Sequence, residues 1–347
     1  MQSIHGISLE QLQQLLEAEG EKPFRAKQIF QWVYEQRVSD WEKMTNLSHS
    51  LRSLLASKLS LTTLKHIATQ DSKDQETTKF LWELSDGKRV ESVLICSGDR
   101  RTVCVSSQVG CPARCAFCAS GKEGLMRNLS VEEIFEQVYQ IDLALHAKGE
   151  RVSHVVFMGM GEPFENYENV LACIRQLIDP IRLNLSQRRI TVSTVGVVEG
   201  MAKFRQEGLK VNLVLSLHAP NQHIRKKIIP YARKYPLEDV LAEMIAFAKE
   251  SKRDITYEYT LIQGINDLPE HAEELAALLR GQPCTVNLIP YNPVVGLHLQ
   301  RPEKSAIETF RQILDDKGIV ATWRYTKGKD ISAACGQLAL QKAEKNS

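Results

Sequence analysis

The sequence predicts an α/β protein: a partial (β/α) barrel joined to a small N-terminal helical domain by a short β extension. Three changes of pattern along the 347 residues support this prediction. Apolar residues recur at spacings of three and four over residues 1–60, alternate with polar ones over 61–106, and form strands separated by amphipathic helices over 107–340. Apolar strands alternating with such helices indicate a parallel sheet covered by helices. In a barrel of this kind the active site lies at the carboxyl ends of the strands.

Each element before the barrel has its own signal. The helices expected in the N-terminal domain are EQLQQLLEAEG, AKQIFQWVYEQ and SHSLRSLLASKL. Gly20 and Pro23 separate the first two, because glycine and proline interrupt helices. The strands expected in the β extension are KFLWEL, RVESVLI and TVCVSS, with a turn at 85–87 between the first two.

The predicted barrel begins with a long helix, VEEIFEQVYQIDLALHA, for which Ser130 and Glu133 form a capping-box pattern. Further strands are expected at HVVFMGM, RITVSTVG, KVNLVLSLHA, ITYEYTLI, CTVNLIPYN and VATWRY. The helices between them are expected at YENVLACIRQLI, PLEDVLAEMIAFAKES, LPEHAEELAALLRG and EKSAIETFRQILDDKG. Residues 341–347 are expected to be a polar tail.

Composition excludes some classes of protein. The 44 basic and 42 acidic residues leave a net charge of +2, so any contact with RNA must come from local patches. The sequence has neither an apolar run of about 20 residues nor a signal-peptide pattern, so we expect a cytoplasmic protein without a membrane partner. Eight cysteines in such a chain are expected to be free thiols rather than a disulfide scaffold, and Cys173 and Cys284 fit that description.

Cys111, Cys115 and Cys118 form a C-x3-C-x2-C motif after the strand TVCVSS. Three close thiolates are one ligand short of a closed tetrahedral site, which indicates a metal or cluster with an open position. Gly110 and Gly121 on either side would let the loop curl around such a centre. A zinc knuckle that lacks its fourth ligand and incidental buried cysteines are the alternatives at this point.

Polar residues follow several of the later strands. Met158–Pro163 follows HVVF, and its Gly161 and Glu162 would allow a ligand to approach the backbone and would hold an ammonium group, although a plain turn is the alternative. The other residues that end apolar strands are Ser193, Ser216, Leu217, His218 and Asn292. Each alone is a weak signal, because serines there usually cap helices. Together they indicate one rim around a ligand.

Two more cysteines and one carboxylate are candidates. Cys335 precedes a glycine among small residues, which suggests an accessible thiol on a loop; a buried cysteine in a short helix is the alternative. Cys104 lies in the strand before the cysteine motif and is a candidate partner thiol. Glu91 lies within the strand RVESVLI, where alternation alone favours a side chain that faces solvent.

Three cationic segments are candidates for RNA contact, since cations interleaved with aromatic residues suit phosphate contacts and base stacking. Solvated surface charge is the alternative for each. The segments comprise His223, Arg225, Lys226, Lys227, Arg233 and Lys234 with two tyrosines; Lys22, Arg25 and Lys27 near Phe24; and Lys327 with Lys329.

These motifs together resemble the RlmN/Cfr family of radical S-adenosylmethionine (radical SAM) RNA methyltransferases, and RlmN more than Cfr. The matching segments are CVSSQVGCPARCAFC, RNLS, FMGMGEP, VSTVG, SLHAPN, NLIPYNP and DISAACGQL, with FRAKQIFQWVYEQ and MTNLS in the N-terminal domain. Two segments depart from typical RlmN sequences: Ala-Ser-Gly after the cysteine motif is nearer to Cfr, and Tyr-Thr-Lys at 325–327 replaces Arg-Thr-Arg.

The resemblance implies an enzyme of the radical SAM barrel type that methylates C2 of an adenosine in 23S rRNA, with tRNA as a second substrate. C8 methylation, as in Cfr, is the closest alternative. A non-catalytic RNA-binding protein with a zinc or iron–sulfur staple and a radical enzyme acting on a small molecule are more distant ones. The implied cofactors are one 4Fe-4S cluster and two molecules of SAM per turnover. A flavodoxin or ferredoxin is the implied electron donor, and we expect a monomer.

The resemblance also implies roles for individual residues. Cys335 would be methylated by a first SAM and would deliver the carbon to adenine as a radical. Cys104 would release the product and leave a Cys104–Cys335 disulfide, and Glu91 would act as the general base. The cluster ligands would be Cys111, Cys115 and Cys118, and the SAM contacts would be Gly161, Glu162, Ser193, Ser216, Leu217, His218 and Asn292.

Overall fold

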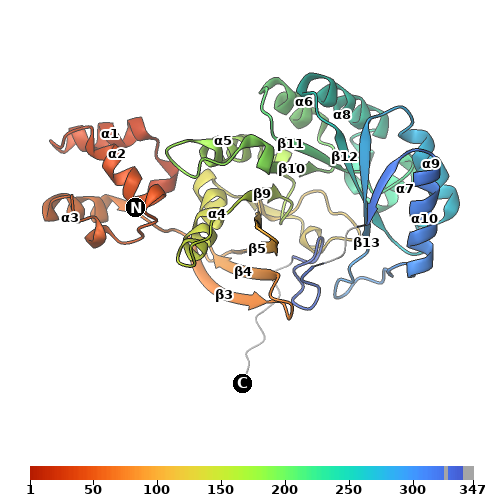
Figure 1. Ribbon diagram of the computed structural model, residues 1–347, viewed down its shortest axis with the longest axis horizontal. Helices are drawn as coiled ribbons and strands as arrows, with labels where there is room; N and C mark the ends of the chain where they lie inside the picture. Colours follow the sequence, from red (N-terminus) through yellow and green to blue (C-terminus); the bar gives the residue numbers. More distant parts are fainter. Residues whose placement is uncertain (324–326, 339–347) are drawn as a thin grey trace.

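The computed structural model describes residues 1–323 and 327–338 (Figure 1). The expected polar tail and most of the 325–327 segment therefore lie outside the described residues. The N-terminal domain stands at one side of the molecule, and the curved sheet with its covering helices forms the rest (Figure 1). No helix in the described part of the chain is both long and apolar enough to cross a membrane.

The N-terminal domain contains the three predicted helices. They are α1 (Leu9–Ala18), α2 (Arg25–Phe30), which continues as a π-helical turn (Gln31–Glu35), and α3 (His49–Lys58). Ser8 caps α1 in a capping box with Gln11, which satisfies backbone donors at the helix start. The domain is closed at its two ends by a short parallel pair, β1 (Gln2–Ser3) with β2 (Leu59–Ser60).

One mixed sheet organises the rest of the chain, in the order β14-β13-β12-β11-β10-β9-β6-β5-β4-β3. The strands from β14 to β6 in this order are parallel to one another, and they include every strand predicted for the barrel. Their bounds are β6 (Arg100–Cys104), β9 (His154–Phe157), β10 (Ile190–Thr194), β11 (Asn212–Ser216), β12 (Ile255–Leu261), β13 (Cys284–Pro290) and β14 (Val320–Trp323). Within the described residues β14 and β3 are free edges, so the barrel is partial, as predicted.

The β extension is part of this sheet rather than a separate linker. Its strands β3 (Lys65–Asp71), β4 (Thr77–Glu83) and β5 (Arg89–Ser97) pair antiparallel in sequence order. Strand β6 then pairs antiparallel with β5 and parallel with β9. The sequence pattern identified β4, β5 and β6 but missed β3. It also missed this continuity, because pairing between β6 and β9 joins residues that are distant along the chain.

Helices cover the outside of the parallel strands (Figure 1). They are α4 (Val131–His146), α5 (Tyr167–Ile178), α6 (Val198–Gln206), α7 (Gln222–Ile228), α8 (Leu237–Ser251), α9 (Pro269–Leu278) and α10 (Lys304–Asp316). The capping box of Ser130 and Glu133 is present at α4. The prediction omitted α6 and α7, which are the two shortest of these helices. In α6, Gly200 is needed because a Cβ there would lie 2.6 Å from the Phe164 Cβ.

The N-terminal domain packs against α4 and α5 through a buried arginine. Arg182, which follows α5, donates to the carbonyl of Ile7 at 2.6 Å and to the Tyr34 hydroxyl at 2.7 Å. Its guanidinium also lies 4.9 Å from the centre of the Tyr34 ring, a cation–π distance. These contacts join residues of both domains in one buried cluster.

Candidate active site

The cysteine motif forms a tight loop between two short antiparallel strands, β7 (Gln108–Gly110) and β8 (Leu125–Asn128). The predicted glycine roles are confirmed. Gly110 has φ +78°, and a Cβ on it would lie 2.0 Å from the carbonyl oxygen of Gly124. A Cβ on Gly121 would lie 2.8 Å from the Arg114 Cα. Only glycine therefore allows the loop to close on itself here.

The three thiols of the loop are held in their neutral form. Burial raises the pKa of Cys111 to about 12, and the neighbouring Cys118 adds to the shift. The pKa of Cys115 is raised well above its usual value by burial and by the other two thiols, and burial also raises the pKa of Cys118. Three thiols in one desolvated place would become thiolates together only with a positively charged partner, such as iron.

A cavity of about 120 Å³, called here the cysteine cavity, lies where this loop meets the carboxyl ends of the strands. It collects most of the predicted site residues on one lining. Those residues are Cys111, Cys115, Cys118, Gly161, Glu162, Ser193, Ser216, His218, Asn292 and Cys335. Since they come from the cysteine loop, four strand ends and the C-terminal segment, the predicted common rim is present.

Glu162 is fixed in the wall of the cysteine cavity by three donors. Its Oε1 accepts from the Phe164 backbone N–H at 3.0 Å and from the Thr194 hydroxyl at 2.7 Å, and its Oε2 accepts from the Val195 N–H at 2.8 Å. Burial nevertheless raises the pKa of Glu162 from 4.5 to about 7. A nearby cation, such as an ammonium group, would stabilise its charged form.

Neighbouring strand ends hold four more of the predicted residues. Gly161 has φ +110°, and a Cβ there would lie 2.7 Å from the Ser107 Oγ, so close approach to the backbone requires glycine. The hydroxyls of Ser193 and Ser216, on β10 and β11, lie 3.1 Å apart. His218 follows β11 with φ +54°, and burial followed by the nearby charge of Arg225 lowers its pKa to about 3. Its ring is therefore neutral.

Asn292 and Leu217 differ in what they present to the cysteine cavity. The Asn292 amide donates to the Cys335 carbonyl at 3.2 Å, and its buried Oδ1 has no hydrogen-bond partner among the described residues. An acceptor of this kind suits a ligand donor. Leu217 is fully buried outside the cavity lining, and its backbone carbonyl accepts from Arg225 at 3.2 Å, so its side chain does not reach the site.

The C-terminal segment brings Cys335 to the cysteine loop. The thiol-bearing residue is exposed, as predicted, and the next residue, Gly336, accepts at its carbonyl from the Ala119 N–H at 2.8 Å. Cys104, at the end of β6, is close enough for an electrostatic interaction with Cys335, while burial is the main cause that raises the pKa of the Cys104 thiol. The disulfide implied for this pair is absent: all eight cysteines are described, and each is a free thiol.

The prediction that Glu91 faces solvent is wrong. The residue is only 2% exposed, and its carboxylate lies 3.3 Å from the Nζ of Lys79, which is also buried. Successive residues of β5 from Val90 to Leu94 are buried, so both faces of this strand are covered. Glu91 does not line the cysteine cavity, but it stands two residues from Val93, which pairs with Cys104. Glu91 and Cys104 therefore lie on the same face of the sheet.

The sequence analysis misassigned one candidate functional residue and missed another. Arg225 was grouped with exposed cations for RNA contact, but it is 0% exposed, while Lys226 and Lys227 beside it are exposed. Glu258, within β12, lines the cysteine cavity and was not singled out. A carboxylate in an otherwise apolar strand was the available signal, the same one that drew attention to Glu91.

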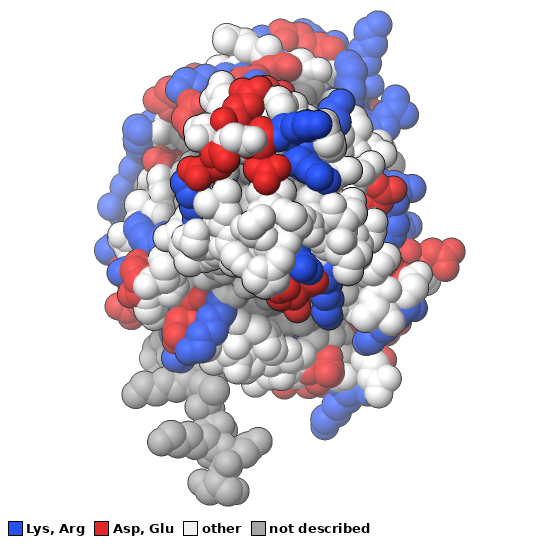
Figure 2. Space-filling view, turned by 90° about the vertical axis from the view of Figure 1, so that its left-hand side faces the viewer, with Lys and Arg blue, Asp and Glu red and all other residues white. Residues whose placement is uncertain are grey.

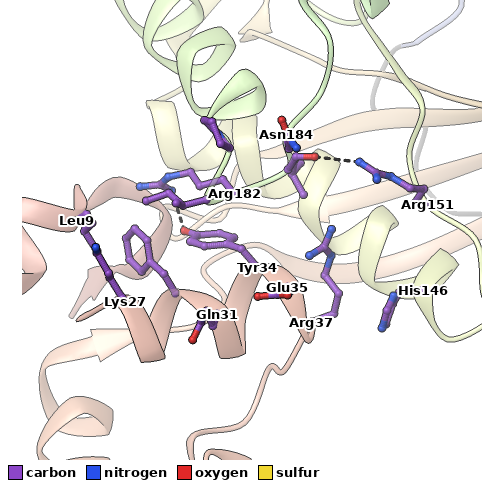
Figure 3. Close-up of a pocket in the computed structure, with 14 residues that line it drawn as sticks. Leu9, Lys27, Gln31, Tyr34, Glu35, Arg37, His146, Arg151, Arg182 and Asn184 are labelled. Atoms are coloured by element: carbon purple, nitrogen blue, oxygen red, sulfur yellow. Dashed lines mark hydrogen bonds between the residues drawn. The ribbon is translucent and has the colours of Figure 1, made fainter. Parts of the chain in front are cut away.

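A larger cavity of about 520 Å³, called here the junction cavity, lies between the N-terminal domain and the barrel. Figure 3 shows Arg37, Arg151 and Arg182 approaching the same space from different segments. Arg182 is fully engaged, but Lys27 and Arg151 are exposed. The cavity contains no cysteine, so we place the chemistry in the smaller one.

Comparison with known proteins agrees with the architecture. The model of the ribosomal RNA large subunit methyltransferase N-terminal domain matches residues 2–61, and that of the radical SAM superfamily matches residues 105–279. A "probable dual-specificity RNA methyltransferase RlmN 2" of Protochlamydia amoebophila is 65% identical over 96% of this chain and 94% of its own length. A "probable dual-specificity RNA methyltransferase RlmN" of Symbiobacterium thermophilum is 46% identical over 97% of this chain and 91% of its own.

One solved structure is similar to this chain over nearly the whole length of both proteins. The radical SAM methyltransferase from Sphaerobacter thermophilus has a TM-score of 0.94 and 44% sequence identity, with 97% of this chain and 99% of that chain covered. The relatives, both family models and the arrangement of the cysteine cavity agree with one another. The chain therefore belongs to the RlmN family of radical SAM RNA methyltransferases.

Proposed function

We propose that this protein methylates C2 of an adenosine in 23S rRNA, and an adenosine of tRNA, by a radical SAM mechanism. One observation carries the proposal: the cysteine cavity joins the three-cysteine loop, polar strand ends and the exposed Cys335 on one lining. The dual specificity rests on the names of the relatives in Protochlamydia amoebophila and Symbiobacterium thermophilum. Because these RNAs are cytoplasmic, we expect the enzyme there.

The residues of the cysteine loop fit an iron–sulfur cluster better than a zinc ion. A single zinc needs all its thiolates about 2.3 Å away. Within the described residues, no group of three or more His, Cys, Asp or Glu is gathered around such a point. A 4Fe-4S cluster instead takes its thiolates on different irons, so the ligands stand farther apart. Cys111, Cys115 and Cys118 would hold it, and the iron charge would stabilise their thiolates.

The other residues of the lining fit SAM. Glu162 offers a carboxylate whose charge a ligand ammonium would favour, and Asn292 offers an acceptor without a partner. Ser193 and Ser216 offer hydroxyls within the same cavity, and Gly161 allows the ligand to approach the backbone. His218 is neutral, and because its Nδ1 accepts from the Thr260 N–H, its other ring nitrogen would offer an uncharged donor. Together the cluster and SAM would supply one-electron chemistry able to remove hydrogen from a methyl group.

Cys335 would carry the methyl carbon, because it is the exposed thiol at the mouth of the cysteine cavity. Cys104 would release the product from Cys335, with which it interacts electrostatically. Glu91 would accept the proton of the substrate adenine from the sheet face that it shares with Cys104, and Lys79 is the ion-pair partner of its carboxylate. Leu217 would act only through its backbone.

Local cations, rather than a broad basic surface, would contact the RNA. Figure 2 looks at the side of the N-terminal domain and shows basic and acidic side chains interspersed around an uncharged centre. Lys27 and Arg151 at the junction cavity are exposed cations that could bind phosphate groups. A low-potential donor of the flavodoxin or ferredoxin class would supply electrons, and we expect a monomer.

The test uses purified protein with an anaerobically reconstituted cluster, labelled SAM, and RNA fragments from 23S rRNA and tRNA. We expect SAM cleavage under reducing conditions and label in 2-methyladenosine of both RNAs. Label in 8-methyladenosine would favour the Cfr-like alternative, and failure to cleave SAM would favour a non-catalytic RNA-binding protein. Activity on a metabolite that survives ribonuclease treatment would favour a small-molecule enzyme.

A further inference from the structure

A buried arginine behind the cysteine loop has a hydrogen-bond donor without an acceptor. Arg225, on α7, is 0% exposed. Its Nε donates to the Leu217 carbonyl at 3.2 Å, and its Nη2 donates to the Val195 carbonyl at 2.5 Å and approaches the Ser216 carbonyl at 3.4 Å. Its buried Nη1 has no hydrogen-bond partner among the described residues. A buried cation in this state is costly, so an anion is expected beside it in the working protein.

The cysteine loop packs directly on the helix that carries this arginine. The Ala116 N–H, between two cysteines of the motif, donates to the Ile228 carbonyl on α7 at 2.8 Å. Ile228 shares an apolar cluster with Phe117 of the loop, and Cys115 packs against the same cluster. Burial lowers the pKa of Arg225 to about 10, and its electrostatic interaction with Cys115 opposes that shift. The guanidinium therefore lies on the α7 side of the loop, within electrostatic reach of Cys115.

None of the other titratable residues near this place supplies the missing anion. Glu258, on β12 and paired in register with Ser216, lines the cysteine cavity, but it is not among the groups that shift the pKa of Arg225. His218 is neutral, since burial and the charge of Arg225 lower its pKa to about 3. Glu162 already accepts from Phe164, Thr194 and Val195. The cysteine loop remains as the source of negative charge.

We propose that Arg225 tunes the iron–sulfur cluster, with its Nη1 donating to the Cys115 sulfur once the cluster is bound. The proposal rests on the proposed function, because it requires the cluster. A cluster that accepts one electron from the external donor becomes more negative, so a fixed cation beside it favours the reduced state. No covalent bond forms or breaks at Arg225. The same guanidinium also ties the ends of β10 and β11 through their carbonyls, which holds the charge in place.

Substitutions at Arg225 can distinguish the effect of its charge on the cluster from the effect of its shape. We would measure the reduction potential of the reconstituted cluster by electron paramagnetic resonance during a redox titration, without SAM or RNA. The variants are Arg225→Gln and Arg225→Lys, with Lys226→Gln as the matched control, because Lys226 is exposed on the same helix. We expect a lower potential in Arg225→Gln, a smaller shift in Arg225→Lys and none in Lys226→Gln. An unshifted Arg225→Gln, or equal shifts in the two Arg225 variants, would overturn the proposal.

If the Arg225 variants do not assemble a cluster, a measurement on the chain without substitutions at this position tests the proposal instead. Protein grown with guanidino-¹⁵N arginine should show hyperfine coupling between ¹⁵N and the reduced cluster in pulsed resonance spectra. Arg175→Lys is the control, since Arg175 is an exposed arginine on α5 outside the cysteine cavity and its loss should leave the coupling intact. A coloured protein without this coupling would overturn the role of Arg225 alone. A protein that binds no cluster would overturn the proposed function as well.

Discussion

The cysteine cavity and the junction cavity are built in opposite ways. The cysteine cavity is small, about 120 Å³, and its carboxylate, hydroxyls and imidazole are held by neighbouring backbone and side chains. The junction cavity is about 520 Å³ and has exposed cations at its edge. The first suits chemistry, which needs groups fixed before the ligand arrives. The second suits contact with a charged polymer, which needs accessible cations.

If the cysteine cavity is the reaction centre, loss of one cluster ligand should have the largest effect. Cys115→Ala is expected to abolish the brown colour, the roughly four irons per chain and SAM cleavage, because two thiolates cannot hold the cluster. Iron analysis after anaerobic reconstitution is the measurement. Cys284→Ala is the control, since Cys284 lies on β13 outside this lining. Full iron content in Cys115→Ala would contradict the assignment.

The second-largest expected effect distinguishes cluster binding from methyl transfer to RNA. Cys335→Ala is expected to keep its irons, because the thiol is not a proposed ligand, yet to transfer no methyl group to RNA. Iron content and RNA methylation should be measured on the same preparation, with Cys96→Ala as a control outside the cavity lining. Normal methylation by Cys335→Ala would remove the thiol from the mechanism.

A smaller effect follows from the raised pKa of Glu162. Its folded pKa of about 7, against 4.5 ordinarily, means that the folded cluster-free protein binds a proton that the unfolded chain has released. Its contribution to stability is therefore present at low pH and lost as the pH rises through about 7. Between pH 5.5 and 7.5 the wild type should lose about 2 kcal/mol more unfolding free energy than Glu162→Gln. Urea unfolding tests this, and parallel pH profiles would contradict it.

The smallest effect concerns the junction cavity. Lys27→Ala combined with Arg151→Ala should weaken RNA binding about fivefold, taking about 0.5 kcal/mol for each exposed charge. The slope of log affinity against log salt should fall by about two, one for each lost phosphate contact. Lys249→Ala, an exposed lysine on α8, is the control. Unchanged affinity and salt slope would leave the junction cavity without a role in RNA contact.

The sequence predicted the parts of this protein that depend on local pattern. Helix α4 has a capping box and strand β12 an apolar run, and both were found as expected. The loop glycines could also be predicted, since a tight turn beside the cysteines requires them. The prediction from sequence was wrong where contacts between residues distant along the chain determine which side chains are buried. Arg225 belongs by sequence to a basic run, but the packing of α7 on the cysteine loop buries it, and Glu91 is buried because both faces of β5 are covered.

The most direct test of the account is the identity of the methylated carbon in cells. RNA from cells with and without this gene product, grown with methyl-deuterated methionine, should be digested to nucleosides and separated by mass spectrometry. The account predicts labelled 2-methyladenosine in 23S rRNA and tRNA, lost without the protein and not restored by Cys335→Ala. Unchanged 2-methyladenosine, or label in 8-methyladenosine instead, would contradict it.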